Sequence, residues 1–399
     1  IINDQGELYV YGSTDAQDYP TTANAYDDTA NGGIDIVISR FNTDGTALLG
    51  STYVGGSGTD GRNQFSNNYG DQYRGEIFLT QDGLPVIASN TTSDNFPTSP
   101  GAYQTSYGGG GQDAAGLKFN ASLSNLLWSS YFGSAGDDVG LGIRTAENGD
   151  IVICGTAGAG LPTTAGSYQT ALAGDRDGFI ARFNGAGNTL VACTYFGTDA
   201  LDQCFFIDLD NDEDVWVYGQ SAGDMPIIGD VFNQPEGSLF VTKFNGSLSN
   251  VEVSSRIGEA SFFGGSAAVP VAFLVDRCDN IYISGYSAQD GLPITDDAVY
   301  DDGGFYLAAF GIDISTLEFG TYYPSNHVDG GTSRFDKNGI VYQGVCSGGD
   351  FPTNADAWGP VQNTGWDIGV FKMDFEVSGV NASLTASAEA LNGCAPHNV

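Results

Sequence analysis

Positive charge is scarce in this sequence, and long apolar runs are missing. Only 13 of the 399 residues are Lys or Arg, against 49 Asp or Glu, so the formal net charge is −36. A chain of this kind lacks the clustered cations that bind phosphates or anionic lipid headgroups, and we predict no nucleic-acid partner and no electrostatic attachment to a membrane. No stretch approaches the roughly 20 apolar residues of a membrane-spanning helix, which argues against direct membrane insertion.

Recognisable catalytic motifs are also few. The chain has only two histidines, His327 and His397, and it contains neither a His-Glu-x-x-His sequence nor a Walker loop. Gly56–Gly61 matches the letters Gly-x-Gly-x-x-Gly, but no helix is expected after it. A carboxylate pair for glycoside hydrolysis does not stand out among so many Asp residues. We therefore predict that the chain is not an enzyme.

Glycine and aromatic residues, in contrast, are abundant. Glycine accounts for 58 residues, well above the usual fraction of about 7%. Hydrophobic residues make up 41% and aromatic residues 12%, which is enough for a packed core. Many glycines and Asp or Asn residues between β-branched and aromatic positions indicate short strands joined by tight turns, so we predict an all-β fold.

A repeated phrase organises the chain. It consists of an apolar residue followed by proline, with an aromatic residue six positions after the proline, or seven in the fifth copy. A strand-like run precedes each phrase, and a second run that usually ends in a basic and an aromatic residue follows it. We expect the basic residue to counter surrounding carboxylates and the aromatic residue to fill a gap between neighbouring units. The six copies are Pro20…Tyr26, Pro97…Tyr103, Pro162…Tyr168, Pro226…Phe232, Pro293…Tyr300 and Pro352…Trp358.

Six repeats of four strands each predict a six-bladed β-propeller of four-stranded blades. A linear β-solenoid is the competing architecture, but its repeats are usually shorter. The first unit begins inside its innermost strand, at Ile1 and Ile2, so a seventh blade stays open as an alternative if upstream residues are missing. The predicted propeller covers 1–387, with repeats at approximately 1–63, 64–138, 139–202, 203–267, 268–330 and 331–387.

The repeats resemble those of a known family. Phe96–Gln104 and Ser51–Ser57 are close matches to the SBBP-type β-propeller repeat, and the resemblance extends to about Ser387. Leu391–Val399 resembles the opening of a PKD-type domain, so 388–399 is interpreted as a linker and the start of a PKD-like domain. The resemblance implies a large secreted surface protein of Bacteroidetes-like bacteria, many of which use type IX secretion and are linked to adhesion or gliding. The family offers no catalytic residues to transfer.

The resemblance leads to three functional hypotheses. The first is a non-enzymatic extracellular or cell-surface module that binds a glycan or protein through loops at the propeller ends, alongside other domains of a longer chain. The second is a purely structural module that assembles a surface filament or complex. The third is a divergent hydrolase. We expect an extracellular location under each of them.

One acidic loop is a candidate calcium site. Asp208, Asp210, Asp212 and Asp214 alternate as carboxylates do in calcium loops, which makes Ca²⁺ the cofactor that the sequence suggests. The loop lacks the glycine expected at its sixth position and lies where other repeats have an acidic hairpin turn. A solvated turn therefore stays open as the alternative interpretation.

The six cysteines allow disulfides in a secreted chain. Cys193 and Cys204 flank one crossover between units, so we predict a disulfide between them. Buried free thiols are the alternative. No Cys-x-x-Cys spacing occurs, which argues against a zinc site.

Overall fold

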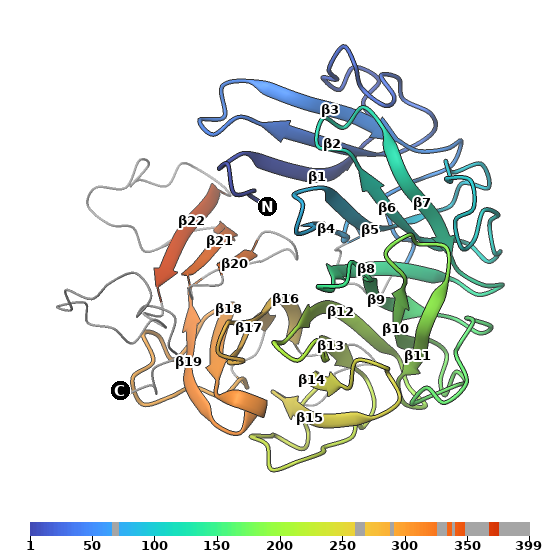
Figure 1. Cartoon of the computed structure of the whole chain (residues 1–399). Helices are drawn as coiled ribbons and strands as arrows, with labels where there is room; N and C mark the ends of the chain where they lie inside the picture. Colours follow the sequence, from blue (N-terminus) through green and yellow to red (C-terminus); the bar gives the residue numbers. More distant parts are fainter. Residues whose placement is uncertain are drawn as a thin grey trace.

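The computed structural model describes residues 1–65, 72–259, 268–287, 291–324, 333–336, 340–347 and 367–374. These residues form six antiparallel sheets arranged around a common centre (Figure 1). The single helical element in the described part is a short 3-10 turn, Ile312–Ile314. None of the described segments is a helix with the length and hydropathy that crossing a membrane requires. The all-β class predicted from the sequence is confirmed.

The strands follow the order of the repeats, and each sheet is built from consecutive strands. The first sheet holds β1 (Leu8–Thr14), β2 (Asp35–Phe41) and β3 (Leu48–Val54). The second holds β4 (Glu76–Leu79), β5 (Pro85–Thr91), β6 (Asp113–Phe119) and β7 (Leu126–Phe132), and the third holds β8 (Asp138–Thr145), β9 (Ile151–Ala157), β10 (Asp177–Phe183) and β11 (Leu190–Phe196). The fourth holds β12 (Asp202–Leu209), β13 (Val215–Ser221), β14 (Leu239–Phe244) and β15 (Val251–Ile257). The fifth holds β16 (Ala268–Val275), β17 (Ile281–Ser287), β18 (Phe305–Phe310) and β19 (Leu317–Tyr323), and the sixth holds β20 (Ser333–Asp336), β21 (Ile340–Ser347) and β22 (Asp367–Asp374).

The sheets match the expected blades where they are described. The second to fifth sheets have four strands each, as predicted. The first has three, and the main chain of Ile1 and Ile2 pairs with β1 through the bridge between Ile2 and Leu8 and the hydrogen bond from Tyr9 N to Ile1 O. In the sixth sheet three strands are described, and the predicted fourth run and the tail at 388–399 lie outside the described residues. Closure of the ring, the blade number and the repeat boundaries stay predictions.

Local side-chain hydrogen bonds explain why the chain turns where it does. An Asn follows each of β2, β6, β10 and β14, and its side-chain oxygen accepts main-chain N–H groups of the hairpin that comes next. Asn120 Oδ1, for example, accepts hydrogen bonds from the main-chain N–H of Ser124 at 2.9 Å and Asn125 at 3.1 Å. Such bonds compete with strand pairing and so end the strand at a fixed residue.

The aromatic residue of each repeated phrase connects one sheet to the next. The Tyr103 ring lies 5.6 Å, centroid to centroid, from Phe183 of β10, and the Tyr103 N–H donates to Gly187 O at 3.1 Å. Tyr26, Tyr168 and Phe232 make the same contacts with the following sheet, at ring separations of 5.6, 5.9 and 5.6 Å. The prediction that this residue fills a gap between units is confirmed for these four copies.

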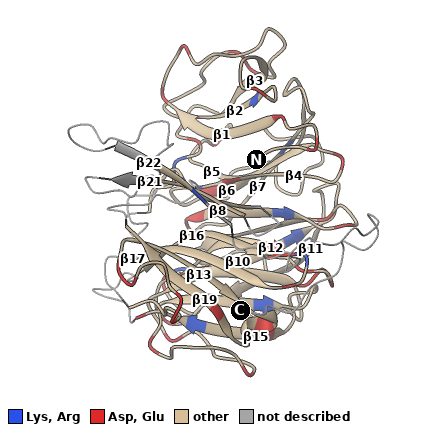
Figure 2. Cartoon of the chain, turned by 90° about the vertical axis from the view of Figure 1, so that its left-hand side faces the viewer, with Lys and Arg blue, Asp and Glu red and all other residues tan. Residues whose placement is uncertain are grey.

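Basic residues at the repeated position on β2, β10 and β14 lie beside carboxylates, as predicted. Arg40 bonds to Glu7, and Arg182 Nε lies 3.0 Å from Asp150 Oδ2. Lys243 Nζ lies 2.9 Å from Asp210 Oδ2. In Figure 2 the few Lys and Arg positions lie among more numerous Asp and Glu positions.

A buried ionic chain joins the inner strands of three sheets. Arg144 of β8 lies between Glu76 of β4, with Nη1 to Oε1 at 2.7 Å, and Asp208 of β12, with Nε to Oδ1 at 3.1 Å. All three side chains are at most 11% exposed. The second carboxylate oxygens accept main-chain N–H groups of Ile143 and Val275. The chain thereby connects the second sheet to the fifth near the centre of the molecule.

Candidate ligand-binding pocket

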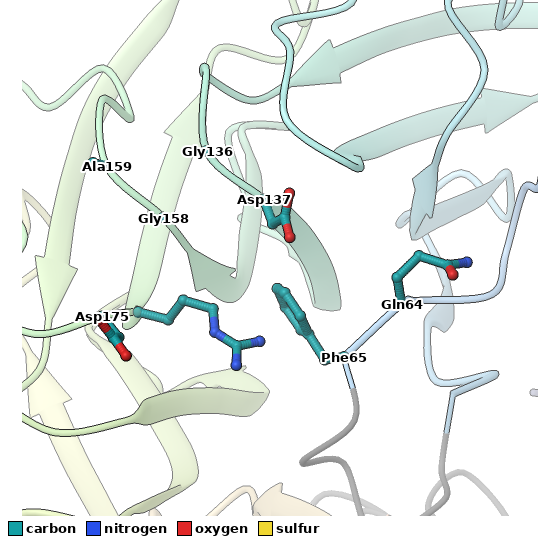
Figure 3. A pocket seen from close by; sticks show the side chains of 8 residues that line it. Gln64, Phe65, Gly136, Asp137, Gly158, Ala159 and Asp175 are labelled. Carbon is teal, nitrogen blue, oxygen red and sulfur yellow. The ribbon is translucent and has the colours of Figure 1, made fainter.

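A pocket of about 460 Å³ lies where crossover loops of the second and third sheets meet (Figure 3). Its lining comes from the segment before β4, the loop between β7 and β8, the turn after β9 and the residues before β10. Loops at the strand ends of a rigid sheet are where binding residues are most often placed. The lining residues are Gln64, Phe65, Gly136, Asp137, Gly158, Ala159, Asp175 and Arg176.

The central feature of the pocket is an arginine stacked on an aromatic ring. Arg176 Cζ lies 4.0 Å from the centroid of the Phe65 ring, and Phe65 itself is only 5% exposed. The Arg176 main chain is fixed by a parallel bridge to Leu201 and by the hydrogen bond from Asp202 N to Arg176 O at 3.0 Å. This cation–π contact orients the guanidinium group in a partly dry environment.

No protein acceptor is bonded to the Arg176 guanidinium among the described residues. Burial lowers its pKa, and the nearby charges of Asp137 and Asp175 oppose that shift without forming an ion pair. In a chain with a net charge of −36, an unpaired arginine in a pocket leaves its N–H donors available to a ligand.

The remaining lining adds acceptors and exposed backbone. The Asp137 carboxylate and the Phe65 ring point toward one another in Figure 3. Asp137 Oδ1 accepts Gly111 N at 2.6 Å, which fixes the carboxylate. Gly136 and Gly158 are packed so closely that a Cβ on Gly136 would lie 2.9 Å from Gly158 Cα. Side chains are therefore excluded there, and the loops expose their backbone to the pocket.

A second pocket, of about 380 Å³, lies at the junction of the first and second sheets. It is lined by Tyr26, Asp27, Asn31, Gly55, Gly56, Asn95 and Pro97. Acceptors and backbone groups line it, but no cation does. The two pockets are therefore chemically different, and only the first offers a guanidinium group.

The structure gives the predicted calcium residues other partners. Asp208 pairs with Arg144, and Lys243 Nζ lies 2.9 Å from Asp210 and 3.5 Å from Asp214. Asp210 also accepts main-chain N–H groups of Asp212 and Asp214, which closes the loop as a hairpin turn. Within the described part of the chain, no group of three or more His, Cys, Asp or Glu side chains is placed to hold a metal ion. The geometry favours a hairpin turn, in which Asp208 and Asp210 are buried beside cations and not solvated as the alternative interpretation expected. Calcium binding stays an untested prediction.

The predicted disulfide between Cys193 and Cys204 is not formed. Both residues are buried free thiols, as is Cys154. Cys193 lies on β11, the outermost strand of the third sheet, whereas Cys204 lies on β12, the innermost strand of the fourth. The two cysteines are close in sequence but not in space, because the crossover between them runs from the outer edge of one sheet to the inner edge of the next. The alternative of buried thiols is correct for this pair.

Sequence analysis did not identify Phe65 and Arg176 as site residues. Phe65 is one apolar residue among many, and its loop has no catalytic motif. Arg176 carried a weak signal, because the equivalent positions before β2 and β6 hold Ile34 and Gln112. Arg176 also lies outside the regular basic position of the repeat, which Arg182 occupies in the same unit.

Comparisons with known proteins give a likeness of fold. No protein family matches the sequence, and no curated protein is similar to it. Among solved structures, the chain is similar to a protein of unknown function from Dyadobacter fermentans, with 12% identity over 93% of this chain and 92% of that one and a TM-score of 0.48. It is also similar to an ulvan lyase, a polysaccharide lyase (12% identity, 86% and 74% covered, TM-score 0.43), and to the NanB sialidase from Streptococcus pneumoniae (9% identity, 93% and 67% covered, TM-score 0.42). The SBBP-type and PKD-type resemblances stay predictions.

These comparisons correct one expectation. The prediction that the chain is not an enzyme is wrong as an inference from missing motifs, because the structural neighbours include sialidases, a polysaccharide lyase and a phage endosialidase. Enzymes that cleave glycans often rely on carboxylates, and a chain with 49 acidic residues gives no motif by which to recognise or dismiss them. Rarity of histidine does not exclude such activity.

Proposed function

We propose that this chain is an extracellular module that binds an acidic glycan in the pocket formed around Phe65 and Arg176. The observation that supports the proposal most is the guanidinium group of Arg176, which lies 4.0 Å from the Phe65 ring and has no acceptor in the part of the protein that the structure describes. A planar guanidinium binds a carboxylate or sulfate through two parallel hydrogen bonds. An acidic sugar supplies that group together with hydroxyls.

The rest of the pocket fits the hydroxyl groups of a sugar. Asp137 and Asp175 supply acceptors, and the glycine loops at Gly136 and Gly158 present main-chain groups. A volume of about 460 Å³ holds a short stretch of glycan and not a protein surface. The strongly negative remainder of the chain repels acidic polymers, so recognition depends on Arg176 and is selective for this pocket.

The test is a glycan array that contains neutral, uronate-containing, sialylated and sulfated glycans. The purified chain is applied with calcium and with EDTA, and soluble products are analysed for cleaved glycan. We expect binding to acidic glycans, with a loss of at least about tenfold in affinity for Arg176→Ala. Arg62→Ala is the matched control, because Arg62 also stacks on an aromatic ring, Tyr73 at 5.5 Å, but does not line the pocket.

The outcomes separate the alternatives. Equal binding by Arg176→Ala and the unaltered chain would refute the assigned pocket. Preference for neutral glycans would refute the ligand class. Binding that is lost in EDTA would support a calcium requirement, and release of shortened glycans would show that the chain also cleaves its ligand.

A further inference from the structure

Three pairs of buried aspartates recur at the same spacing. They are Asp35 and Asp60, Asp113 and Asp138, and Asp177 and Asp202, and each of these residues is at most 1% exposed. The first member of each pair begins the third strand of one blade, at β2, β6 and β10. The second member lies where the chain enters the next sheet. Each pair therefore lies at a junction between sheets.

In the first pair the two carboxylates converge over a glycine. A Cβ on Gly55 would lie 1.9 Å from Asp35 Oδ1 and 2.8 Å from Asp60 Oδ2, so both oxygens lie close to this glycine. In the second pair a Cβ on Gly133 would lie 2.3 Å from Asp113 Oδ1. The glycine of the repeated Tyr-Val-Gly and Tyr-Phe-Gly sequences is thus required by the carboxylates beside it.

Hydrogen-bond donors are distributed unequally within the first pair. Asp60 Oδ2 accepts Gly56 N at 2.7 Å and Ser93 Oγ at 3.0 Å, and its Oδ1 accepts the Thr91 hydroxyl. Asp35 Oδ2 accepts Asn31 N at 2.7 Å, but its Oδ1, which faces Asp60, has no donor. A buried carboxylate oxygen without a donor is costly when charged.

The second pair shows the same inequality. Asp138 Oδ2 accepts the N–H and the hydroxyl of Ser134 at 2.6 and 3.0 Å, and its Oδ1 accepts Gly158 N at 3.2 Å. Asp113 Oδ2 accepts Gly108 N at 2.5 Å, and its Oδ1 has no donor. One member of each pair is therefore solvated by the protein as an anion, and the other is not.

No cation neutralises these pairs among the residues that the structure describes. The charged side chains that act on them are carboxylates. Asp27 acts on Asp35, and within the pairs Asp35 acts on Asp60 and Asp113 acts on Asp138. The phenols of Tyr107 and Tyr131 face the same carboxylates and are uncharged. Asp60 and Asp138 already direct their oxygens at N–H and O–H donors, which leaves a metal ion only one oxygen per pair.

We propose that Asp35 and Asp113 are protonated in the folded chain at neutral pH, and that each donates a hydrogen bond from Oδ1 to its partner, Asp60 or Asp138. One proton is shared per pair, and it replaces the missing donor. The junctions between the first three sheets then bind protons on folding. Asp177 and Asp202 repeat the spacing, and burial raises the pKa of both, but here the buried oxygen without a donor is Oδ1 of Asp202. The assignment of the protonated member is therefore made for the first two pairs.

Burial raises the pKa of both members of the first two pairs, including that of Asp35. Burial raises the pKa of Asp60 to about 6 and the pKa values of Asp113 and Asp138 to about 7. A carboxyl group whose pKa is higher in the folded than in the unfolded chain binds more protons when folded, so folding becomes more favourable as pH falls from about 8 to about 5. A carboxylate in a buried ion pair has the opposite effect, because its pKa is lower in the folded chain and folding becomes less favourable as pH falls.

The test uses the unequal number of hydrogen-bond donors that the two carboxylates of a pair receive. Asparagine at position 35 or 113 keeps a donor directed at the partner carboxylate without needing a proton. We expect Asp35→Asn and Asp113→Asn to raise the thermal midpoint at about pH 8 and to flatten its rise toward about pH 5. Asp60→Asn and Asp138→Asn place an amide N–H against existing donors, so we expect lower midpoints at every pH. Asp28→Asn, at an exposed acidic residue, is the matched control.

Two results would overturn the proposal. The first is destabilisation by Asp113→Asn equal to that by Asp138→Asn, with the pH dependence unchanged. The second is an increase in midpoint on adding Ca²⁺ at about pH 8 that EDTA reverses and Asp35→Asn abolishes, because that would identify the pairs as metal sites. If a variant does not fold, ¹³C-detected titration of the unaltered chain's aspartate carboxyl groups gives the protonation state directly. Carboxyl groups that are all ionised at about pH 6 would refute the shared proton.

Discussion

Replacing Arg144 is the most informative test of how the inner strands are held together. The guanidinium group connects Glu76 of β4 with Asp208 of β12, at 2.7 and 3.1 Å. Its Nη1 also donates to Ile143 O at 2.7 Å, and it lies 4.8 Å from the Phe78 ring. Arg144→Met keeps most of the side-chain volume and removes the charge and the donors. Two carboxylates that are at most 11% exposed are then left without their cation.

Removal of one partner from a buried ion pair costs about 3–5 kcal/mol, because an uncompensated charge stays in the interior. We expect Arg144→Met to lower the free energy of unfolding by about that amount, measured by urea denaturation with tryptophan fluorescence. Trp216 is fully buried on the adjacent β13 and serves as the reporter.

A triple variant distinguishes charge from packing. Glu76→Gln and Asp208→Asn, combined with Arg144→Met, remove all three charges at similar volume. Because charge burial is then avoided, we expect most of the lost free energy to be recovered. A loss below about 1 kcal/mol for Arg144→Met, or no recovery in the triple variant, would refute the view that this ionic chain holds the inner strands.

Three further predictions concern other buried contacts. Tyr131→Phe leaves Phe96 N and Ser93 O, each 2.8 Å from the hydroxyl, without a partner, so urea denaturation is expected to show a loss of about 2–4 kcal/mol, whereas Tyr168→Phe is expected to change little. Gly133→Ala places a methyl group 2.3 Å from Asp113 Oδ1 and is expected to lower the thermal midpoint strongly, whereas Gly12→Ala, with open space around it, is expected to be neutral; equal midpoints would contradict the crowding argument. Cys193 and Cys204 are expected to react with a thiol reagent only after denaturation, and protection that depends on oxidising conditions would contradict their assignment as free thiols.

The strands were predictable because their signals are local. The strand-like run expected before the first repeated phrase is β1, and the run expected after the second phrase, which ends in a basic and an aromatic residue, is β6. Alternating apolar residues between Gly, Asn and Asp turns carry that information in a few consecutive positions. The connecting role of Tyr103 was also predictable, because a residue that recurs once per unit and is not part of a strand serves the contact between units.

The site was not predictable, because its contacts join distant segments. Phe65 and Arg176 meet only through the packing of the second and third sheets. The alternation from Asp208 to Asp214 suggested calcium, but Lys243 and Arg144 approach those carboxylates from other strands. The paired aspartates were not identified, since one sequence does not show that two carboxylates lie beside the same glycine.

The aromatic contacts between sheets have a direction, and this direction affects how such a chain changes its length. Tyr26, Tyr103 and Tyr168 each lie in the loop of one unit, and the ring of each contacts a phenylalanine ring of the unit that follows. A duplicated unit therefore carries both its own connector and the receiving surface for its predecessor. Gain or loss of a whole unit by genetic duplication or deletion leaves every internal joint intact, and only the two ends of the array have to adapt.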